Sequence, residues 1–271
     1  MPELPEVETV RRGIGPHVQG RRIARVVVRE ARLRRPIPAD LAARFAGVLV
    51  TDIVRRGKYL LFETPAGWLI LHLGMSGSLR LVGAAQPPGK HDHVDLELDD
   101  GRLLRFCDPR RFGLLLWTRE PPVHHPLLAG LGPEPLDESF TGAYLYEKAQ
   151  GRRLAVKSLI MDSRIVVGVG NIYASEALFR ARIRPDRAAG SLGRRDCDRL
   201  VESIKIVLGE AIAAGGTTLR DFVDGQGRPG YFRMQLQVYG RGGEACPVCA
   251  RPLDSARIGQ RSSFFCRRCQ K

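Results

Sequence analysis

Long hydrophobic runs are absent from this sequence. None of its apolar stretches approaches the roughly 18 residues that a membrane-spanning helix requires. The first residues are acidic and rich in proline, unlike a secretory signal. Internal repeats and low-complexity tracts are missing as well. These absences exclude a membrane protein and a secreted disulfide-bonded protein, and we expect a cytoplasmic protein with no membrane partner.

Lysine is scarce. Only six of the 43 basic residues are lysines, and the rest are arginines. Against 29 acidic residues this leaves a formal net charge of +14, which favours a polyanionic partner because a positive field attracts phosphate backbones. An arginine-rich composition is also what a GC-rich genome encodes. A lysine retained in this background is the better candidate for chemistry in which a proton must leave, since guanidinium groups stay protonated.

The remaining pattern is that of a globular protein. The 271 residues, 44% of them hydrophobic, are enough for about two folded domains. Val7, Val10 and Ile14 recur at helical spacing and predict a short helix that ends near Gly13 and Gly15. Short apolar or alternating runs, separated by turn residues, then predict strands at 25–29, 48–54, 58–62, 68–73, 93–99, 102–106 and 113–117. Such a series is typical of an antiparallel sandwich or barrel.

The pattern changes after residue 130. A stretch rich in proline and glycine at 131–136 predicts a linker between domains. Beyond it the periodicity is helical, with one helix expected over 171–181 and another over 200–212, closed by Gly215 and Gly216. Strands followed by helices indicate an α+β chain with more than one domain.

Four of the six cysteines form two closely spaced pairs. Sixteen residues separate Cys246 and Cys249 from Cys266 and Cys269. Two such knuckles complete a tetrahedron of thiolates, which predicts one structural Zn²⁺; two disulfides or a redox pair are the alternatives. The segment 241–271 has a net charge of +5, which favours a zinc ribbon that lies against nucleic acid over one that contacts another subunit.

The second residue, Pro2, carries a further possibility. Removal of the initiator Met would leave a secondary amine, and an α-amine with an ordinary pKa near 8 is partly unprotonated at neutral pH. Such an amine can attack an electrophilic sugar carbon, with Glu3 beside it as an acid. Taken alone, a Met-Pro-Glu start is more often just a disordered end.

Several motifs, taken together, resemble those of bacterial formamidopyrimidine-DNA glycosylases. They span the whole chain in the expected order and end in the four-cysteine ribbon. The motifs are Pro2–Arg12, Arg56–Leu60, His72–Gly77, Asp108–Gly113, Gly168–Glu176 and Gly216–Leu219.

The resemblance implies three domains: a catalytic β-sandwich over 2–132, a helix–two-turns–helix domain with a lesion-lid loop over 133–236, and a zinc finger over 237–271. It also implies an enzyme of base excision repair that acts as a monomer on damaged double-stranded DNA, in the bacterial cytoplasm and at the nucleoid. Its substrates would be 8-oxoguanine and formamidopyrimidines. Neither the zinc nor any organic cofactor would enter the chemistry.

The resemblance also assigns roles to residues. Pro2 would attack the sugar C1′, Glu3 would protonate the ring oxygen, Lys58 would transfer a proton from a strand, and Arg261 would hold the leaving phosphate. Elimination on both sides of the sugar would then cut the strand. DNA contacts would come from a wedge of Met75, Arg110 and Phe112, and from His91, Arg152 and Asn171.

Three points stay open. The segment Thr217–Tyr231 resembles the family's lid over the damaged base, but its central residues are the least diagnostic. An endonuclease VIII-like glycosylase of oxidised pyrimidines shares the Pro-Glu start and the zinc ribbon. A non-enzymatic zinc-ribbon DNA-binding protein would share the charge and the cysteines.

Overall fold

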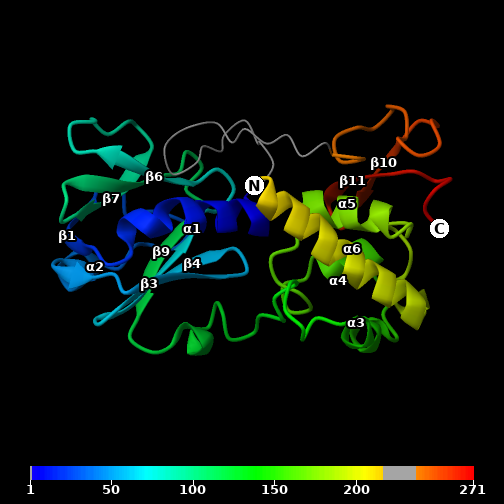
Figure 1. Ribbon diagram of the computed structural model, residues 1–271, viewed down its shortest axis with the longest axis horizontal. Helices are drawn as coiled ribbons and strands as arrows, with labels where there is room; N and C mark the ends of the chain where they lie inside the picture. Colours follow the sequence, from blue (N-terminus) through cyan, green and yellow to red (C-terminus); the bar gives the residue numbers. More distant parts are fainter. Residues whose placement is uncertain (1, 216–235) are drawn as a thin grey trace. The chain divides into compact units, whose positions relative to one another are not determined.

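The computed structural model describes residues 2–215 and 236–271, which form two compact units. The first is described over 2–129 and at Gly215, and the second over 130–214 and 236–271 (Figure 1). The predicted lid lies outside the described residues. The predicted limits of three domains, at 132/133 and 236/237, stay predictions.

Two antiparallel sheets and a long helix build the first unit. The helix is α1 (Leu4–Val18). One sheet has the order β2 (Val48–Leu49), β1 (Arg22–Val28), β7 (Asp92–Leu98), β8 (Arg102–Cys107), β6 (Ser78–Gly83). The other has the order β3 (Asp52–Arg56), β4 (Tyr59–Thr64), β5 (Gly67–His72), β9 (Leu114–Thr118). Apolar residues of both sheets, of α1 and of the short α2 (Leu41–Phe45) share one core, so the predicted antiparallel sandwich is confirmed.

The first helix is longer than its glycines predicted. It continues through Gly15 and Pro16 to Val18, whose side chain is buried together with Val10 and Ile14. The predicted end was wrong because burial of one more apolar residue on the same face outweighs the low helix propensity of glycine.

Two strand predictions were also wrong. The run 48–54 is two strands, because the chain leaves one sheet for the other at Val50. This residue bonds through its N–H to the carbonyl of Arg21, whereas the N–H of Thr51 bonds to the carbonyl of Glu63. Strand β6 was not predicted at all; it follows directly after the Gly-rich His72–Gly77 motif.

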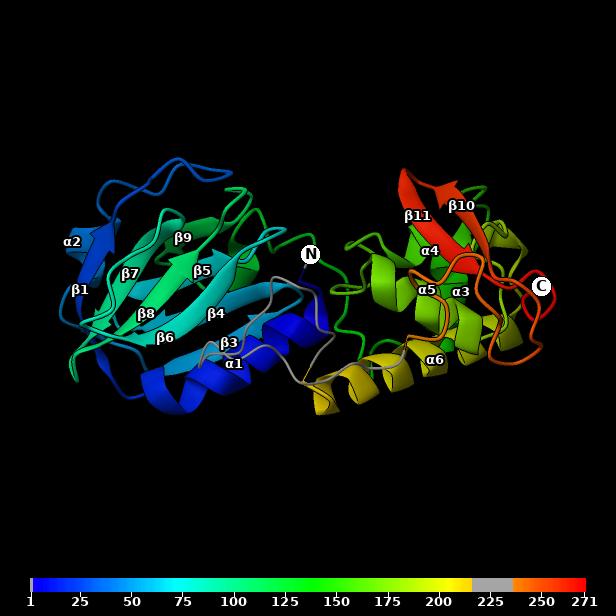
Figure 2. The same ribbon diagram turned by 90° about the horizontal axis from the view of Figure 1, so that it is seen from above.

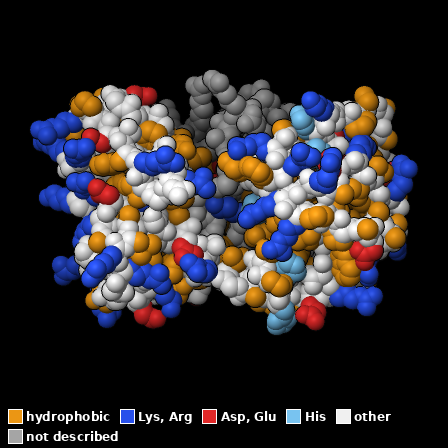
Figure 3. Space-filling model, turned by 180° about the vertical axis from the view of Figure 1, so that it is seen from behind, with side chains coloured by type: hydrophobic (Ala, Val, Ile, Leu, Met, Phe, Trp, Pro, Cys, Tyr) orange, Lys and Arg blue, Asp and Glu red, His pale blue; other side chains and the backbone are white. Residues whose placement is uncertain are grey.

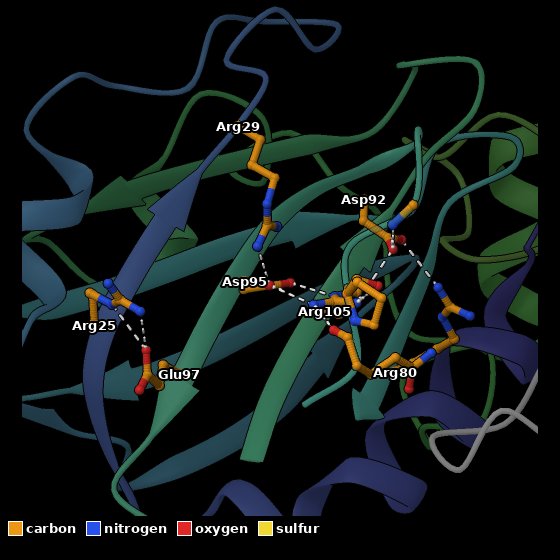
Figure 4. Close-up of polar contacts among 10 residues, drawn as sticks. Arg25, Arg29, Arg80, Asp92, Asp95, Glu97 and Arg105 are labelled. Carbon is orange, nitrogen blue, oxygen red and sulfur yellow. Dashed lines mark hydrogen bonds and ion pairs between the residues drawn. The ribbon is translucent and has the colours of Figure 1, made fainter. Parts of the chain in front are cut away.

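One polar side chain of β7 is buried in an ion pair. Asp95 is 1% exposed and accepts two hydrogen bonds of 2.9 Å from Arg105, which is equally buried, and one of 2.6 Å from Arg29 (Figure 4). Arg105 also donates to the carbonyls of Gln86 and Pro87. A buried ion pair satisfied in this way ties the sheet to the 86–87 loop and fixes the register locally.

Four helices and a hairpin build the second unit (Figure 2). They are α3 (Gly142–Ala149), α4 (Val156–Ile160), α5 (Asn171–Arg180), α6 (Arg194–Ala213), β10 (Asp254–Ile258) and β11 (Arg261–Phe265). Short 3₁₀ turns occur at Pro122–His124 in the first unit and Ala189–Ser191 in the second. The two predicted helices are confirmed, although α6 begins at Arg194, before the first residue of the predicted apolar stripe, Leu200. Within 2–215 and 236–271, no helix has both the length and the apolar character to cross a membrane.

Candidate functional site

The candidate residues are divided between the two units. The first unit holds Pro2, Glu3, Lys58, Met75, His91, Arg110 and Phe112, and the second holds Arg152, Asn171, Arg261 and the four cysteines. Lys and Arg side chains cover much more of the face in Figure 3 than Asp and Glu do, as the net charge predicts.

The chain start is buried and fixed. Pro2 is buried, and Glu3, which is 1% exposed, is the cap residue that precedes α1. The backbone N–H of Glu3 donates to Oε2 of Glu6 over 2.8 Å, which satisfies a donor at the free end of the helix. Pro2 and Glu3 are therefore held by folded structure, and the disordered end considered above is excluded.

Lys58 lies in a turn, and the prediction that it belongs to a strand was wrong. Arg56 pairs with Tyr59, so Gly57 and Lys58 form the two-residue connection between β3 and β4. Gly57 has a φ of +56°, which this kind of tight hairpin requires and which glycine adopts without strain. The turn keeps the partly buried Lys58 outside the β-ladder.

His72 is a neighbour of Lys58 that the sequence did not single out as a site residue. Burial lowers the pKa of His72 to about 4, and the positive charges of Lys58 and Arg34 act in the same direction. Its Nδ1 accepts a 2.9 Å hydrogen bond from the N–H of Gly74, so the neutral imidazole carries its proton on Nε2. Only the pairing of β4 with β5, which sets Tyr59 opposite His72, could have revealed it.

The predicted wedge residues lie on two loops joined by a buried carboxylate. Asp108 is fully buried and accepts from the Ser76 hydroxyl over 2.8 Å and from the N–H groups of Gly113 and Arg110 over 2.7 and 3.3 Å. The loop next to Met75 is thus fixed to the loop that presents Arg110 and Phe112.

The same platform leaves the wedge side chains accessible. Phe112 is 45% exposed, and the Arg110 guanidinium lies 5.1 Å from the centre of its ring. Gly74 has a φ of +66°, and a Cβ there would lie 2.4 Å from the carbonyl carbon of Phe112. Close backbone packing therefore supports the platform, and only glycine permits it.

The run of His91, Asp92 and His93 supports this platform through hydrogen bonds. Nε2 of His93 bonds to the carbonyl oxygen of Asp108 over 2.8 Å, and the carbonyl of His91 accepts from the N–H of Asp108. Asp92 pairs with Arg80. In the part of the chain that the structure describes, the four cysteines are the only group of three or more His, Cys, Asp or Glu side chains placed to hold a metal.

In the second unit the structure brings Asn171 next to the strand that begins with Arg261. Nδ2 of Asn171 donates to the carbonyl of Ser262 over 3.1 Å, and its Oδ1 is buried without a hydrogen-bond partner among the described residues. Asn171 is the first residue of α5 and Gly170 is its cap, so the Asn171 side chain does not cap this helix. Arg261 is exposed at the start of β11, and Arg152 is exposed after α3.

Lys157 is a second residue that sequence reasoning missed. It is 1% exposed and donates to the Ser263 hydroxyl over 2.7 Å and to the Ser262 carbonyl over 3.1 Å. These bonds fix the strand that begins with the exposed Arg261 against α4. Its retention as lysine in an arginine-rich chain was the one available signal.

The four cysteines fit a single zinc ion. Their sulfur atoms all lie within 4.8 Å of one another, with 3.9 Å between Cys246 and Cys269 and 3.5 Å between Cys249 and Cys266. Four Zn–S bonds of about 2.3 Å in a tetrahedron place sulfurs about 3.8 Å apart. Four sulfur ligands leave no open position, so the metal stabilises the ribbon, whose small apolar core includes Phe179, Val238 and Leu253.

Comparisons with known proteins match this architecture along the chain. Three family models match: the formamidopyrimidine-DNA glycosylase N-terminal domain at 1–115, its H2TH domain at 131–223, and a zinc finger found in FPG and IleRS at 243–271. The formamidopyrimidine-DNA glycosylases of Syntrophotalea carbinolica and Methylococcus capsulatus are each 59% identical over 271 residues, which is 100% of both chains.

Solved structures of the same family have a similar fold. The MutM (Fpg) protein of Thermus thermophilus has a TM-score of 0.89 at 40% identity and covers 99% of this chain and 98% of its own. Lactococcus lactis Fpg in complex with DNA containing an abasic site has a TM-score of 0.92 at 33% identity, with 100% of both chains covered. Another Lactococcus complex, of a mutant Fpg with Fapy-dG DNA, has a TM-score of 0.91 at 33% identity and also covers 100% of both chains.

An antiparallel sandwich, a helical unit and a four-cysteine ribbon define a class of multidomain α+β zinc-finger proteins. The match of all three parts, at 59% identity to full-length relatives, places the chain within that class. The chain belongs to the formamidopyrimidine-DNA glycosylase family.

Proposed function

We propose that this protein is a DNA glycosylase and abasic-site lyase that excises oxidised purines from duplex DNA, with Pro2 as the nucleophile. One observation carries the proposal: Pro2 and Glu3 are held at the buried start of α1 in a chain that matches named glycosylases over its whole length. The Lactococcus complexes with Fapy-dG and abasic-site DNA support the lesion class.

The first step replaces the bond from sugar to base with a bond from sugar to protein. Once Met1 is removed, the lone pair of the Pro2 nitrogen attacks C1′. The base leaves with the electrons of the glycosidic bond and takes up the proton that the Pro2 nitrogen releases. Glu3 donates a proton to the ring oxygen, the ring opens, and C1′ becomes an iminium carbon bound to Pro2. Glu3 is buried at a fixed position, which suits an acid that must reach one atom.

The iminium then drives strand cleavage. It acidifies the protons on C2′, and loss of one expels the 3′ phosphate by β-elimination; a second elimination expels the 5′ phosphate. Lys58 moves protons beside the neutral His72, and Arg261 stabilises the departing phosphate by its charge. Water finally releases Pro2 from the sugar fragment.

The remaining residues hold the DNA. Met75, Phe112 and Arg110 fill the space left by the extruded base, and Arg110 bonds to the opposing cytosine, since unstacking must be compensated. His91, Arg152 and Asn171 contact phosphates. The protein acts as a monomer at the bacterial nucleoid, in the cytoplasm.

The test is trapping of the covalent intermediate. Borohydride added to the protein and a duplex with 8-oxoguanine opposite cytosine reduces the iminium to a stable adduct, seen as a shifted band on a denaturing gel. A matched variant with one extra alanine before Pro2 converts the Pro2 nitrogen into an unreactive amide and moves the free amine one residue away. This variant should give little or no adduct and still bind the duplex. Undiminished trapping by that variant would exclude Pro2 as the nucleophile.

Two further results would separate the alternatives. Faster excision of thymine glycol than of 8-oxoguanine would indicate the endonuclease VIII-like specificity. Binding of the lesion duplex with neither excision nor trapping by the processed protein would indicate a non-enzymatic DNA-binding protein.

A further inference from the structure

A strongly basic cavity lies in the second unit, at the C-terminal end of α5. Its volume is about 700 Å³. The lining side chains include five arginines and one lysine against a single aspartate, a net charge of +5. The charged residues are Arg180, Arg182, Arg187, Arg199, Arg268, Lys271 and Asp196, and Val248 and Cys269 complete the wall.

Backbone bonds hold the walls of this cavity in place. Lys271 forms two of them: its N–H donates to the carbonyl of Arg182, and its backbone oxygen accepts from the N–H of Arg184, each over 3.0 Å. The Gln270 side chain donates to the carbonyl of Ile183 over 2.8 Å and accepts from the N–H of Cys266 over the same distance. The zinc knuckle is thereby attached to the segment after α5, so the cationic side chains project from fixed backbone.

Half of the cations have no acidic partner. Asp196 binds Arg187 and Arg199 at 2.9 and 2.7 Å, and Arg180 lies 3.5 Å from Glu210. Arg182, Arg268 and Lys271 form no ion pair within residues 2–215 and 236–271. Like charges held around one hollow repel each other, and an anion in the hollow relieves that repulsion.

Arg182 lies at a backbone position that favours glycine. It follows the C-terminal cap of α5 with a φ of +56°, a left-handed conformation at a position where helices usually have glycine. The side chain of Arg182 is exposed, so core packing does not account for it.

The cavity is distinct from the DNA contacts proposed above. Asn171 begins α5 and Arg180 ends it, so the two ends of the helix are roughly 14 Å apart at 1.5 Å per residue. The cavity can therefore be occupied while Asn171 and Arg261 contact a phosphate backbone.

We propose that this cavity binds a short acidic peptide segment of a partner protein, one that carries aspartates or glutamates beside an apolar side chain. Guanidinium groups bind carboxylates in pairs of parallel hydrogen bonds. Val248, 65% exposed at the wall, offers an apolar contact that a phosphate backbone would leave unused. A concave hollow of this volume fits a few side chains, whereas a DNA duplex presents a broad convex surface.

The probe is a fluorescein-labelled peptide of four aspartates followed by leucine and phenylalanine, titrated with the full-length zinc-bound protein at physiological salt. The cavity variant combines Arg182→Gly, which suits the local backbone, with Arg268→Gln and Lys271→Gln. The control variant loses the same charge at exposed positions outside the cavity: Arg153→Gln, Arg251→Gln and Arg257→Gln. Zinc content and thermal unfolding establish that each variant is folded.

The peptide should bind at least about ten-fold more weakly to the cavity variant and no more than about three-fold more weakly to the control, because only cavity charges lie close to the ligand. Strand cleavage should fall no further in the cavity variant than in the control variant, since each loses two charges of the ribbon, and a peptide with asparagine for aspartate should not bind. If the triple variant fails to fold, Arg182→Gly alone should weaken binding about three-fold. Equal weakening by the two triple variants, or equal binding of the asparagine peptide, would overturn the proposal. Equal loss of affinity for an undamaged duplex and for the peptide would show that the cavity is a DNA contact instead.

Discussion

Replacement of Asp108 by asparagine tests whether one buried carboxylate holds the two wedge loops together. Asparagine has nearly the same shape but replaces one acceptor oxygen with an NH₂ donor. In the structure one carboxylate oxygen, Oδ2, accepts from Gly113, and the other, Oδ1, accepts from Ser76 and Arg110.

The magnitude follows from counting these bonds. If the asparagine oxygen faces Gly113, the Ser76 hydroxyl can turn and accept from the new NH₂, but the N–H of Arg110 loses one acceptor. In the opposite orientation, the N–H of Gly113 meets another donor. In the first orientation the Arg110 N–H keeps the Ser76 oxygen at 3.2 Å, so the substitution costs a charge-assisted hydrogen bond, which lowers the free energy of unfolding by about 1.5–3 kcal/mol. Asp108→Ala leaves two or three donors unsatisfied, and we expect a loss of about 3–5 kcal/mol.

The assay has two parts. Urea unfolding gives the stability change, and single-turnover excision of 8-oxoguanine opposite cytosine and opposite adenine gives the functional change. We expect Asp108→Asn to excise about ten-fold more slowly or worse, because small misplacements of positioning groups have effects of this size. The ratio of the excision rate opposite cytosine to that opposite adenine should fall, since Arg110 lies on the loosened loop. Asp137→Asn, which removes an exposed carboxylate in the other unit, is the matched control.

A clear result would refute the reasoning. If Asp108→Asn unfolds within about 0.5 kcal/mol of the parent protein, as surface substitutions usually do, the carboxylate does not join the loops. If stability falls but both excision rates and their ratio match those of Asp137→Asn, the platform does not position Arg110.

Three further predictions rest on other parts of the structure. Burial alone would raise the pKa of Glu8, but hydrogen bonds and charges from neighbouring arginines outweigh it and lower this pKa from 4.5 to about 2. The stabilisation by ionised Glu8 is therefore full above pH 4.5 and is lost as the pH falls toward 2. Glu8→Gln should reduce the free energy of unfolding at pH 7 by about 2 kcal/mol after solvent screening, and should leave it unchanged at pH 2. Equal losses at both pH values, measured by urea unfolding, would contradict this. Removal of zinc by a chelator should release one ion per chain and abolish duplex binding by unfolding the ribbon, and an apo protein that binds with full affinity would disprove a structural role. Gly74→Ala should lower the free energy of unfolding by about 2–4 kcal/mol through backbone strain and a clash with Phe112. Gly20→Ala, at a similar φ but with open space around it, should lower it by only about 1 kcal/mol. Equal losses would show that the close approach of Gly74 to the Phe112 backbone is unimportant.

Local patterns in the sequence predicted most of the elements. The alternation of β7 and the apolar stripe of α6 are periodic signals that need no knowledge of distant residues. Element ends were less predictable, as α1 shows, because the packing of Val18 decides where that helix stops. The metal ligands were predictable for the same reason as the strands: the spacing within each cysteine pair already fixes the geometry of a knuckle.

The candidate site was predictable only where a motif is local. Pro2 and Glu3 are adjacent, and the ordered motifs identified the family. The placement of Lys58 in a turn depended on hairpin register, and the burial of Asp95 depended on an arginine from the next strand.

The sequence by itself determined the family, the zinc ligands, the positive charge and the order of strands and helices, because each is encoded by neighbouring residues or by composition. Tertiary structure alone decided that His72 lies near Lys58, that Asp108 joins two loops, that Lys157 supports the strand of Arg261 and that arginines from three segments surround one cavity. These features join residues far apart in the chain, so they exist only once strand register and helix packing have brought those residues together.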